Sequence, residues 1–151
     1  MTLDHPIIGD RRNWKAALGL LLLRLSIGLI FAGAGWMKIH TFGVANFVRM
    51  SSDSVPSYLP KALGRGYLYA LPWVELVLGI LLIVGLFTRT TALVTALVLV
   101  SIMMAVTGWY ETSPGLSVHT NAVYLMIAMA LALLGPGRWS ADAMLFSRRP
   151  R

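Results

Sequence analysis

Four long apolar runs, separated by short polar segments, dominate the chain. They cover roughly residues 16–37, 67–87, 90–110 and 118–134. A helix needs about 20 apolar residues to cross the ~30 Å hydrocarbon core of a bilayer. The first three runs reach this length, and the fourth lies at the lower edge of the spanning range. The pattern therefore predicts an all-α membrane protein, a bundle of four transmembrane helices forming one domain over residues 1–151.

The first run has a second interpretation, a cleaved signal peptide. It follows the basic residues Arg11, Arg12 and Lys15, and Ala32-Gly33-Ala34 resembles a cleavage site. However, the run is longer than the apolar region of a typical signal peptide, and it contains Arg24. We therefore expect a retained helix.

The segments between the runs predict how the helices are connected. Residues 40–50 mix apolar and polar side chains at helical spacing, which predicts a short amphipathic helix in the membrane interface within the first loop. Only Thr88-Arg89 separates the second run from the third, so these two should form a tight antiparallel hairpin. Gly135-Pro136-Gly137 ends the fourth run, and residues 138–151 form a polar, basic tail.

Composition agrees with a membrane location. Hydrophobic residues make up 57% of the chain and charged residues only 13%, whereas soluble domains carry about 25% charged residues. The net charge is +7, but the basic residues cluster at the ends of the apolar runs. That placement favours contact with anionic lipid over nucleic acid. The chain has no cysteine, which excludes disulfides, a thiol nucleophile and cysteine-ligated clusters.

The distribution of Lys and Arg predicts the orientation, because cytoplasmic loops carry an excess of them. On one side of the bundle lie eight: Arg11, Arg12, Lys15, Arg89, Arg138, Arg148, Arg149 and Arg151. On the other lie four: Lys38, Arg49, Lys61 and Arg65. Both termini are therefore expected in the cytoplasm.

Arg24 and Glu75 are the single charges within the first and second runs. Each costs about 3 kcal/mol in hydrocarbon on insertion scales, so such residues usually face the bundle interior and pair. By helix rise, they lie about 12 Å and about 18 Å from the predicted cytoplasmic ends of their helices. An arginine side chain reaches across that difference, so we expect a direct salt bridge between them.

Small residues accompany these charges. Gly28 and Gly35 share the helix face of Arg24 and Lys38, and Gly79 shares the face of Glu75, which ends at Arg89. Glycines at these positions let two helices approach closely. Two interpretations stay open: the charged pair is a structural clamp, or it lines a pocket for a proton, a quinone or another polar ligand. A lone Glu75 provides no carboxylate pair, so no self-contained catalytic site is predicted, and membership of an enzyme complex stays open.

His40, His119 and Asn121 lie near the predicted outer membrane face, where we expect polar or interfacial contacts. Two histidines on facing helices could ligate a b-type haem, but nothing in the spacing shows such an arrangement. The methionines likewise have no ligand spacing. No metal site is predicted.

Taken in order, several segments resemble the DoxX family of small prokaryotic membrane proteins. These segments are Arg24 with Gly28, Gly35-Trp36-Met37-Lys38, the loop from Gly43 to Pro56, Glu75 to Gly79, Gly85 to Arg89, and Gly135 to Asp142. The last departs from the family pattern at Ala141, where a larger apolar residue is expected. The resemblance spans residues 15 to 142.

The resemblance implies a multi-pass protein of the prokaryotic inner membrane that is linked to redox systems. It implies a non-catalytic subunit of an oxidoreductase or respiratory-type complex, with a quinone and lipids as candidate ligands and other membrane subunits as partners. Arg24, Lys38, Glu75 and Arg89 would be the family's polar positions. Two alternatives remain: a small transporter acting as a homo-oligomer, and a purely structural assembly subunit.

Overall fold

The computed structural model describes residues 13–55, 59–106 and 120–146, and within these ranges it contains helices and no strand. The elements are α1 (Asn13–Trp36), a π-helical segment (Met37–Thr41), α2 (Val44–Ser51), a 3-10 turn (Ser52–Ser54), α3 (Lys61–Val84), α4 (Thr88–Val106), α5 (Thr120–Leu134) and α6 (Ala141–Phe146). The predicted all-α class is thus confirmed for the described part of the chain.

Two of these helical stretches are long and apolar enough to cross a membrane, Trp14–Thr41 and Lys61–Val84. The helices α4 and α5 are also apolar, but their described parts span only 19 and 15 residues. Both adjoin residues 107–119, which lie outside the described residues.

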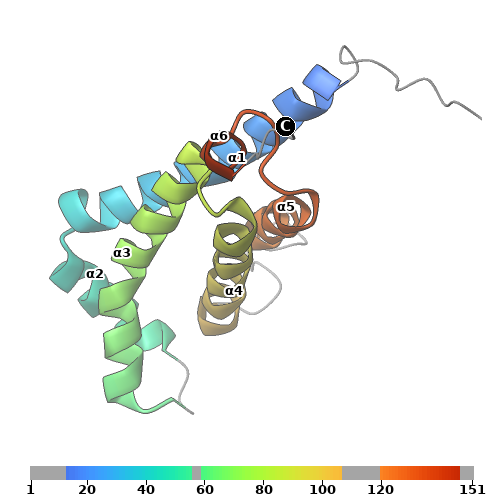
Figure 1. Cartoon of the computed structure of the whole chain (residues 1–151). Helices are drawn as coiled ribbons and strands as arrows, with labels where there is room; N and C mark the ends of the chain where they lie inside the picture. Colours follow the sequence, from blue (N-terminus) through green and yellow to red (C-terminus); the bar gives the residue numbers. More distant parts are fainter. Residues whose placement is uncertain (1–12, 56–58, 107–119, 147–151) are drawn as a thin grey trace, which may run out of the picture.

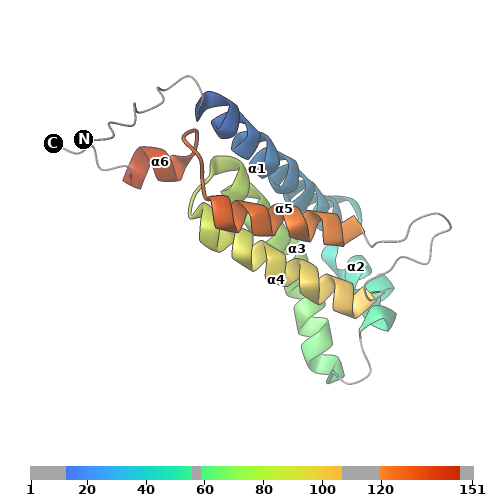
Figure 2. The ribbon, with the colours of Figure 1, turned by 90° about the vertical axis from the view of Figure 1, so that its right-hand side faces the viewer.

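The four apolar helices pack in two close pairs, α1 with α3 and α4 with α5. Additional contacts of α3 with α4 and of α1 with α5 complete the bundle (Figures 1 and 2). The centre is filled by aliphatic and aromatic side chains from all four helices: Ile27, Phe31, Leu78, Leu82, Ala92, Ala96, Leu99, Ala128 and Leu131. Close packing of these side chains holds the helices together, since lipid tails are as apolar as the side chains and van der Waals contact between helices becomes a main attraction.

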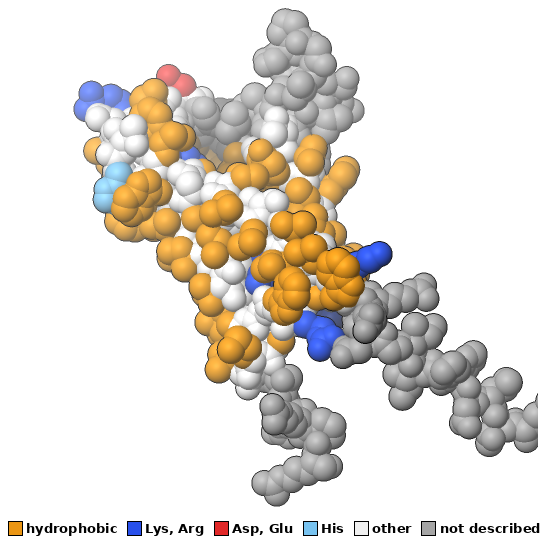
Figure 3. Space-filling view, turned by 90° about the horizontal axis from the view of Figure 1, so that it is seen from above, with side chains coloured by type: hydrophobic (Ala, Val, Ile, Leu, Met, Phe, Trp, Pro, Cys, Tyr) orange, Lys and Arg blue, Asp and Glu red, His pale blue; other side chains and the backbone are white. Residues whose placement is uncertain are grey.

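The outside of the bundle is also apolar. Leu97 is 69% exposed and Leu133 75% exposed, and similar side chains lie on α1 and α3. Figure 3 shows apolar side chains over most of one face, with few charged side chains among them. An exposed apolar surface of this extent is unusual for a soluble monomer and suits contact with lipid.

Several helix ends differ from the predicted ones. The helix α3 begins at Lys61 rather than near Tyr67, directly after Pro60. It ends at Val84 because Gly85 adopts a left-handed conformation (φ 76°) and its N–H returns to the carbonyl of Leu81. The connection to α4 is therefore Gly85–Phe87, not Thr88-Arg89.

Two further differences lie in the loops. The first helix does not stop near residue 37 but continues through the π-helical segment to Thr41, and the interfacial helix is Val44–Ser51 rather than 40–50. The basic tail contains the short helix α6, which was not predicted. A helix of six residues is too short for its spacing to be recognised in the sequence.

Candidate functional site

The described residues contain one buried ion pair, between Lys38 and Glu75. The Lys38 ammonium donates to both carboxylate oxygens of Glu75, at 2.6 and 2.5 Å. The side chain of Glu75 is 5% exposed, whereas that of Lys38 is 19% exposed. The pair thus joins the end of α1 to the middle of α3, and it opens towards the surface on the lysine side.

The π-helical segment Met37–Thr41 positions the lysine. A π-helical turn widens the helix by one residue, and such turns are frequent at functional sites. Here the wider turn follows α1 directly and carries Lys38 and His40. The exposed His40 ring packs on Trp36 with 3.8 Å between ring centroids. His40 therefore lies outside the ion pair.

Aromatic and hydroxyl groups surround the pair. The ring of Phe47, on α2, lies with its centroid 5.2 Å from the Lys38 ammonium, within the range of a cation–π interaction. Tyr67 precedes Glu75 by about two turns on the same face of α3. Its hydroxyl shares a 2.6 Å hydrogen bond with the hydroxyl of Ser101 on α4. We refer to Lys38, Glu75, Phe47, Tyr67 and Ser101 as the ion-pair cluster.

Arg24, in the middle of α1, belongs to a second polar cluster. It is 2% exposed, and its guanidinium donates to the carbonyl of Pro136 at 3.0 Å and to that of Trp139 at 2.6 Å. Its Nε has no hydrogen-bond partner among the described residues. Arg24 therefore binds backbone of the segment between α5 and α6.

The same segment is fastened a second time by Asp142. Its carboxylate accepts the N–H of Phe87 at 2.6 Å and that of Thr88 at 2.7 Å, and so caps the N-terminus of α4. The N–H of Asp142 donates to the carbonyl of Gly85 at 3.0 Å. Asp142 also interacts electrostatically with Arg24. We call Arg24, Asp142 and the segment Gly135–Asp142 the C-terminal latch.

The conformation of the C-terminal latch requires glycine at two positions and a capping serine at a third. Gly135 and Gly137 have φ of 88° and 72°, which favour glycine. The Ser140 hydroxyl accepts the N–H of Ala143 at 3.0 Å and so caps α6. The segment Gly135–Asp142, which follows the last apolar helix, is therefore an ordered part of the fold and not only a basic tail.

The predicted salt bridge between Arg24 and Glu75 is wrong. Gly28 lies against Gly79 and Ile83, and this register places Arg24 beside Gly85. Ten residues of helix separate that level from Glu75, or about 15 Å. The prediction treated the ends of the two helices as level, but α1 begins eleven residues before Arg24, and Arg24 already lies beside Gly85, just past the end of α3 at Val84.

The glycines lie where α1 and α3 touch. A Cβ on Gly28 would stand 2.9 Å from Ile83 Cγ1, one on Gly35 would stand 2.6 Å from the carbonyl oxygen of Pro72, and one on Gly79 would stand 2.7 Å from the carbonyl oxygen of Gly28. Real Cβ atoms rarely approach so closely. These three positions set the distance between the two helices, as small residues do in membrane interfaces.

The remaining predicted site residues lie apart from the ion-pair cluster. Arg89 is exposed and borders a shallow pocket of about 330 Å³ at the start of α4. Asn121 is half-buried in the first turn of α5. His119 lies outside the described residues. Within the described ranges, no three His, Cys, Asp or Glu side chains are grouped so as to hold a metal ion.

Residues that sequence reasoning missed carry much of the geometry. Asp142 ends the Gly135–Asp142 motif, but the sequence alone assigns it no role. Phe47 falls within the predicted amphipathic segment 40–50, and nothing in that pattern indicates its contact with Lys38. The Tyr67–Ser101 bond had no sequence signal, because it joins two helices across 34 positions.

Chemically, the ion-pair cluster offers donors beneath an aromatic ring. An ammonium group has three N–H donors, and Glu75 accepts two of them. The third can serve an acceptor that enters from the exposed side. The arrangement suits binding of a polar group that accepts a hydrogen bond.

Known proteins share this sequence pattern. The profile of the DoxX family matches residues 19–108. The inner membrane protein YqjF of Escherichia coli (strain K12) is 29% identical over 133 residues, which are 85% of this chain and 92% of that protein. No solved structure matches this chain significantly. With its long apolar helices and lipid-suited surface, this membrane protein belongs to the DoxX family.

Proposed function

We propose that this chain is a non-catalytic membrane subunit of an oxidoreductase or respiratory-type complex, and that its ion-pair cluster lines a site for a quinone headgroup. The observation that carries the proposal is the buried Lys38–Glu75 pair, which keeps one lysine N–H available under the ring of Phe47. A quinone has carbonyl acceptors and a flat ring, which fit a donor and an aromatic contact. The chain would bind and orient such a headgroup, while electron transfer would belong to a partner subunit.

We place the protein in the prokaryotic inner membrane with four crossings and both termini in the cytoplasm. The relative YqjF is named an inner membrane protein. Because Lys38 is half-buried in an ion pair, the basic residues left on the predicted outer side are Arg49 on α2 and Lys61 and Arg65 at the start of α3. The excess of basic residues on the side of the termini is thus larger than the sequence count indicated.

The test is gentle purification from native membranes, followed by mass spectrometry of bound protein and of extracted lipid. A copurifying redox enzyme with stoichiometric quinone supports the proposal. The variant Lys38→Met should then lose the quinone, while Arg49→Met, a surface change on α2, should retain it. A homo-oligomer with neither quinone nor redox partner would refute the proposal and favour transport, which liposome flux assays would then examine.

A further inference from the structure

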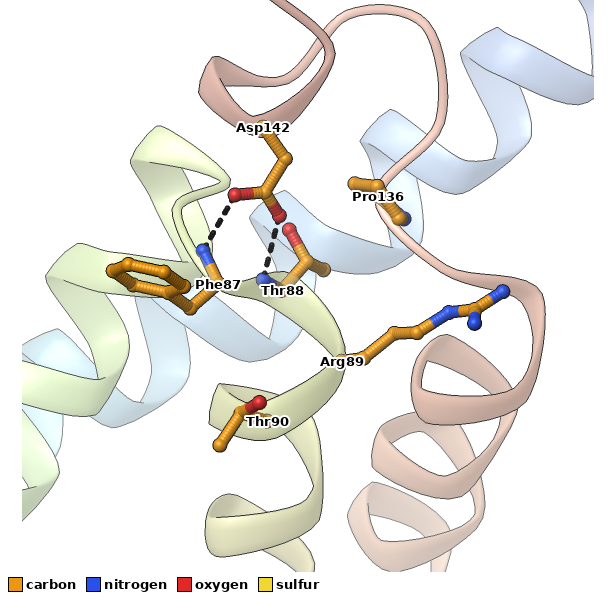
Figure 4. Close-up of a pocket in the computed structure, with 6 residues that line it drawn as sticks. All are labelled: Phe87, Thr88, Arg89, Thr90, Pro136 and Asp142. Carbon is orange, nitrogen blue, oxygen red and sulfur yellow. Dashed lines mark hydrogen bonds between the residues drawn. The ribbon is translucent and has the colours of Figure 1, made fainter. Parts of the chain in front are cut away.

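At the end of the bundle opposite the ion-pair cluster, a pocket of about 330 Å³ lies between the start of α4 and the C-terminal latch. It is lined by Phe87, Thr88, Arg89, Thr90, Pro136 and Asp142 (Figure 4). From this pocket we infer a binding site for one phospholipid with a primary-amine headgroup, a phosphoethanolamine lipid. The inference does not depend on the proposed quinone site.

The pocket carries one charge of each sign. Arg89 is exposed and forms no ion pair with a described residue, and Asp142 borders the same pocket. The two side chains come from different elements and are drawn without a bond between them (Figure 4). The Arg89 guanidinium points away from Asp142 and lies beside Gly135 (Figure 4). A zwitterion carries one group for each of these two side chains.

Asp142 can accept more hydrogen bonds than it does. Each carboxylate oxygen receives one backbone N–H, from Phe87 or from Thr88. A carboxylate has about four acceptor positions, so lone pairs remain for a further donor. A primary ammonium has three N–H groups and can use them, whereas a trimethylated ammonium has none. The half-buried position of Asp142 leaves it accessible.

Arg89 provides the complementary half of the site. A guanidinium binds phosphate through two parallel N–H donors, more specifically than a lysine does. Beside the two charges, the walls include the Phe87 ring, which is 58% exposed, and Pro136. Apolar walls at the end of a lipid-facing bundle suit the glycerol and upper acyl region of a phospholipid.

A simple anion fits this pocket less well. The Asp142 carboxylate, held in place by the α4 cap, opposes a headgroup of net negative charge, and its interaction with Arg24 offsets only part of that effect. The pairing of cation and carboxylate thus predicts selectivity between headgroups of equal size but different hydrogen-bonding capacity.

The experiment is native mass spectrometry of the delipidated full chain, titrated with phospholipids of identical acyl chains. The headgroup series is ethanolamine, its mono- and dimethyl forms, choline and glycerol. We expect one ethanolamine lipid bound about threefold to tenfold more strongly than the choline lipid, as a charge-assisted hydrogen bond provides. Equal retention of the ethanolamine and choline lipids, or stronger retention of the glycerol lipid, would overturn the inference.

Variants locate the site. Arg89→Gln should abolish the selective retention, whereas Arg65→Gln, at the other end of α3, should leave it unchanged. Asp142→Asn keeps a capping acceptor but loses the charge, so the preference for ethanolamine over choline should disappear. If that variant fails to fold, the methylation series on the wild type decides alone. Glycerophosphoethanolamine, which lacks acyl chains, should compete weakly; equal competition would assign the pocket to a soluble metabolite and overturn the lipid assignment.

Discussion

The close contact between α1 and α3 depends on glycine residues. Adding one methyl group at Gly79 tests how much stability this contact provides. In Gly79→Ala, the new Cβ would stand 2.7 Å from the carbonyl oxygen of Gly28 and 2.8 Å from Ala32 Cα. Carbon contacts are favourable at about 3.5–4.0 Å. Both clashing atoms are backbone, so no side-chain rotation relieves them, and the helices must separate by roughly 1 Å.

The expected energy follows from two opposing terms. Overpacking a close contact costs about 1–3 kcal/mol, and replacing glycine by alanine inside a helix returns about 1 kcal/mol. Because the clash is with backbone, we place Gly79→Ala near the upper cost, a net loss of about 1–2 kcal/mol. A methyl group added at Gly33, on α1, would meet no atom within 4 Å, so Gly33→Ala should gain up to about 1 kcal/mol.

The assay is reversible unfolding of the purified chain in mixed micelles with increasing SDS, followed by far-ultraviolet circular dichroism. Gly33→Ala is the matched control, since it makes the same chemical change at an open position. Gly28→Ala should fall between the two, because its nearest contact is the Ile83 side chain at 2.9 Å. If Gly79→Ala and Gly33→Ala unfold at the same SDS fraction, the reasoning about backbone contact is refuted.

Other expectations concern the two polar clusters. Asp142→Ala should lower the free energy of unfolding by about 1–2 kcal/mol, as loss of a helix cap does, and Asp142→Asn should recover most of it in the same assay; equal losses would argue against capping. Removing one member of the ion pair, by Lys38→Met or Glu75→Leu, should lower the free energy of unfolding by about 3–5 kcal/mol, while the double variant should be closer to wild type. A double-mutant cycle measures this, and additive losses would contradict it. Arg24→Met should release the latch, seen as faster hydrogen exchange at the amide of Asp142; unchanged exchange would show that Arg24 does not hold it.

Hydropathy predicted the helical class because bilayer thickness and backbone hydrogen bonding leave few alternatives for long apolar runs. It also placed Gly28, Gly35 and Gly79 on the charged faces, since helical periodicity orders residues within one helix. The length of a helix and the residues that share one of its faces are properties of a single helix, so they can be predicted from the sequence.

The partners of the charged residues were harder to predict from the sequence, because they depend on how neighbouring helices align. Arg24 and Glu75 are the sole charges in their runs, which suggested a pair, yet a register difference of about 15 Å separates them. Lys38, predicted on the same face of the first helix as Arg24, is the residue that pairs with Glu75. A change of a few residues in a helix end is enough to exchange one partner for another.

A helix cap supplied by a residue far along the chain is even harder to predict from the sequence. Asp142 caps α4 from 54 positions away, and no local pattern distinguishes it from a solvated acidic residue. The family motif around Gly135–Asp142 marked the segment, but its mechanical role emerges only from the three-dimensional arrangement.

The C-terminal latch also has a consequence for biogenesis. During synthesis α1, α3 and α4 leave the ribosome well before Asp142, so the first turn of α4 lacks its cap and the Arg24 guanidinium lacks its carbonyl acceptors until the last part of the chain is made. Both groups are costly to leave unsatisfied in the membrane. A chain that ends before residue 142 would thus keep both groups unsatisfied, and completion of the chain satisfies both at once.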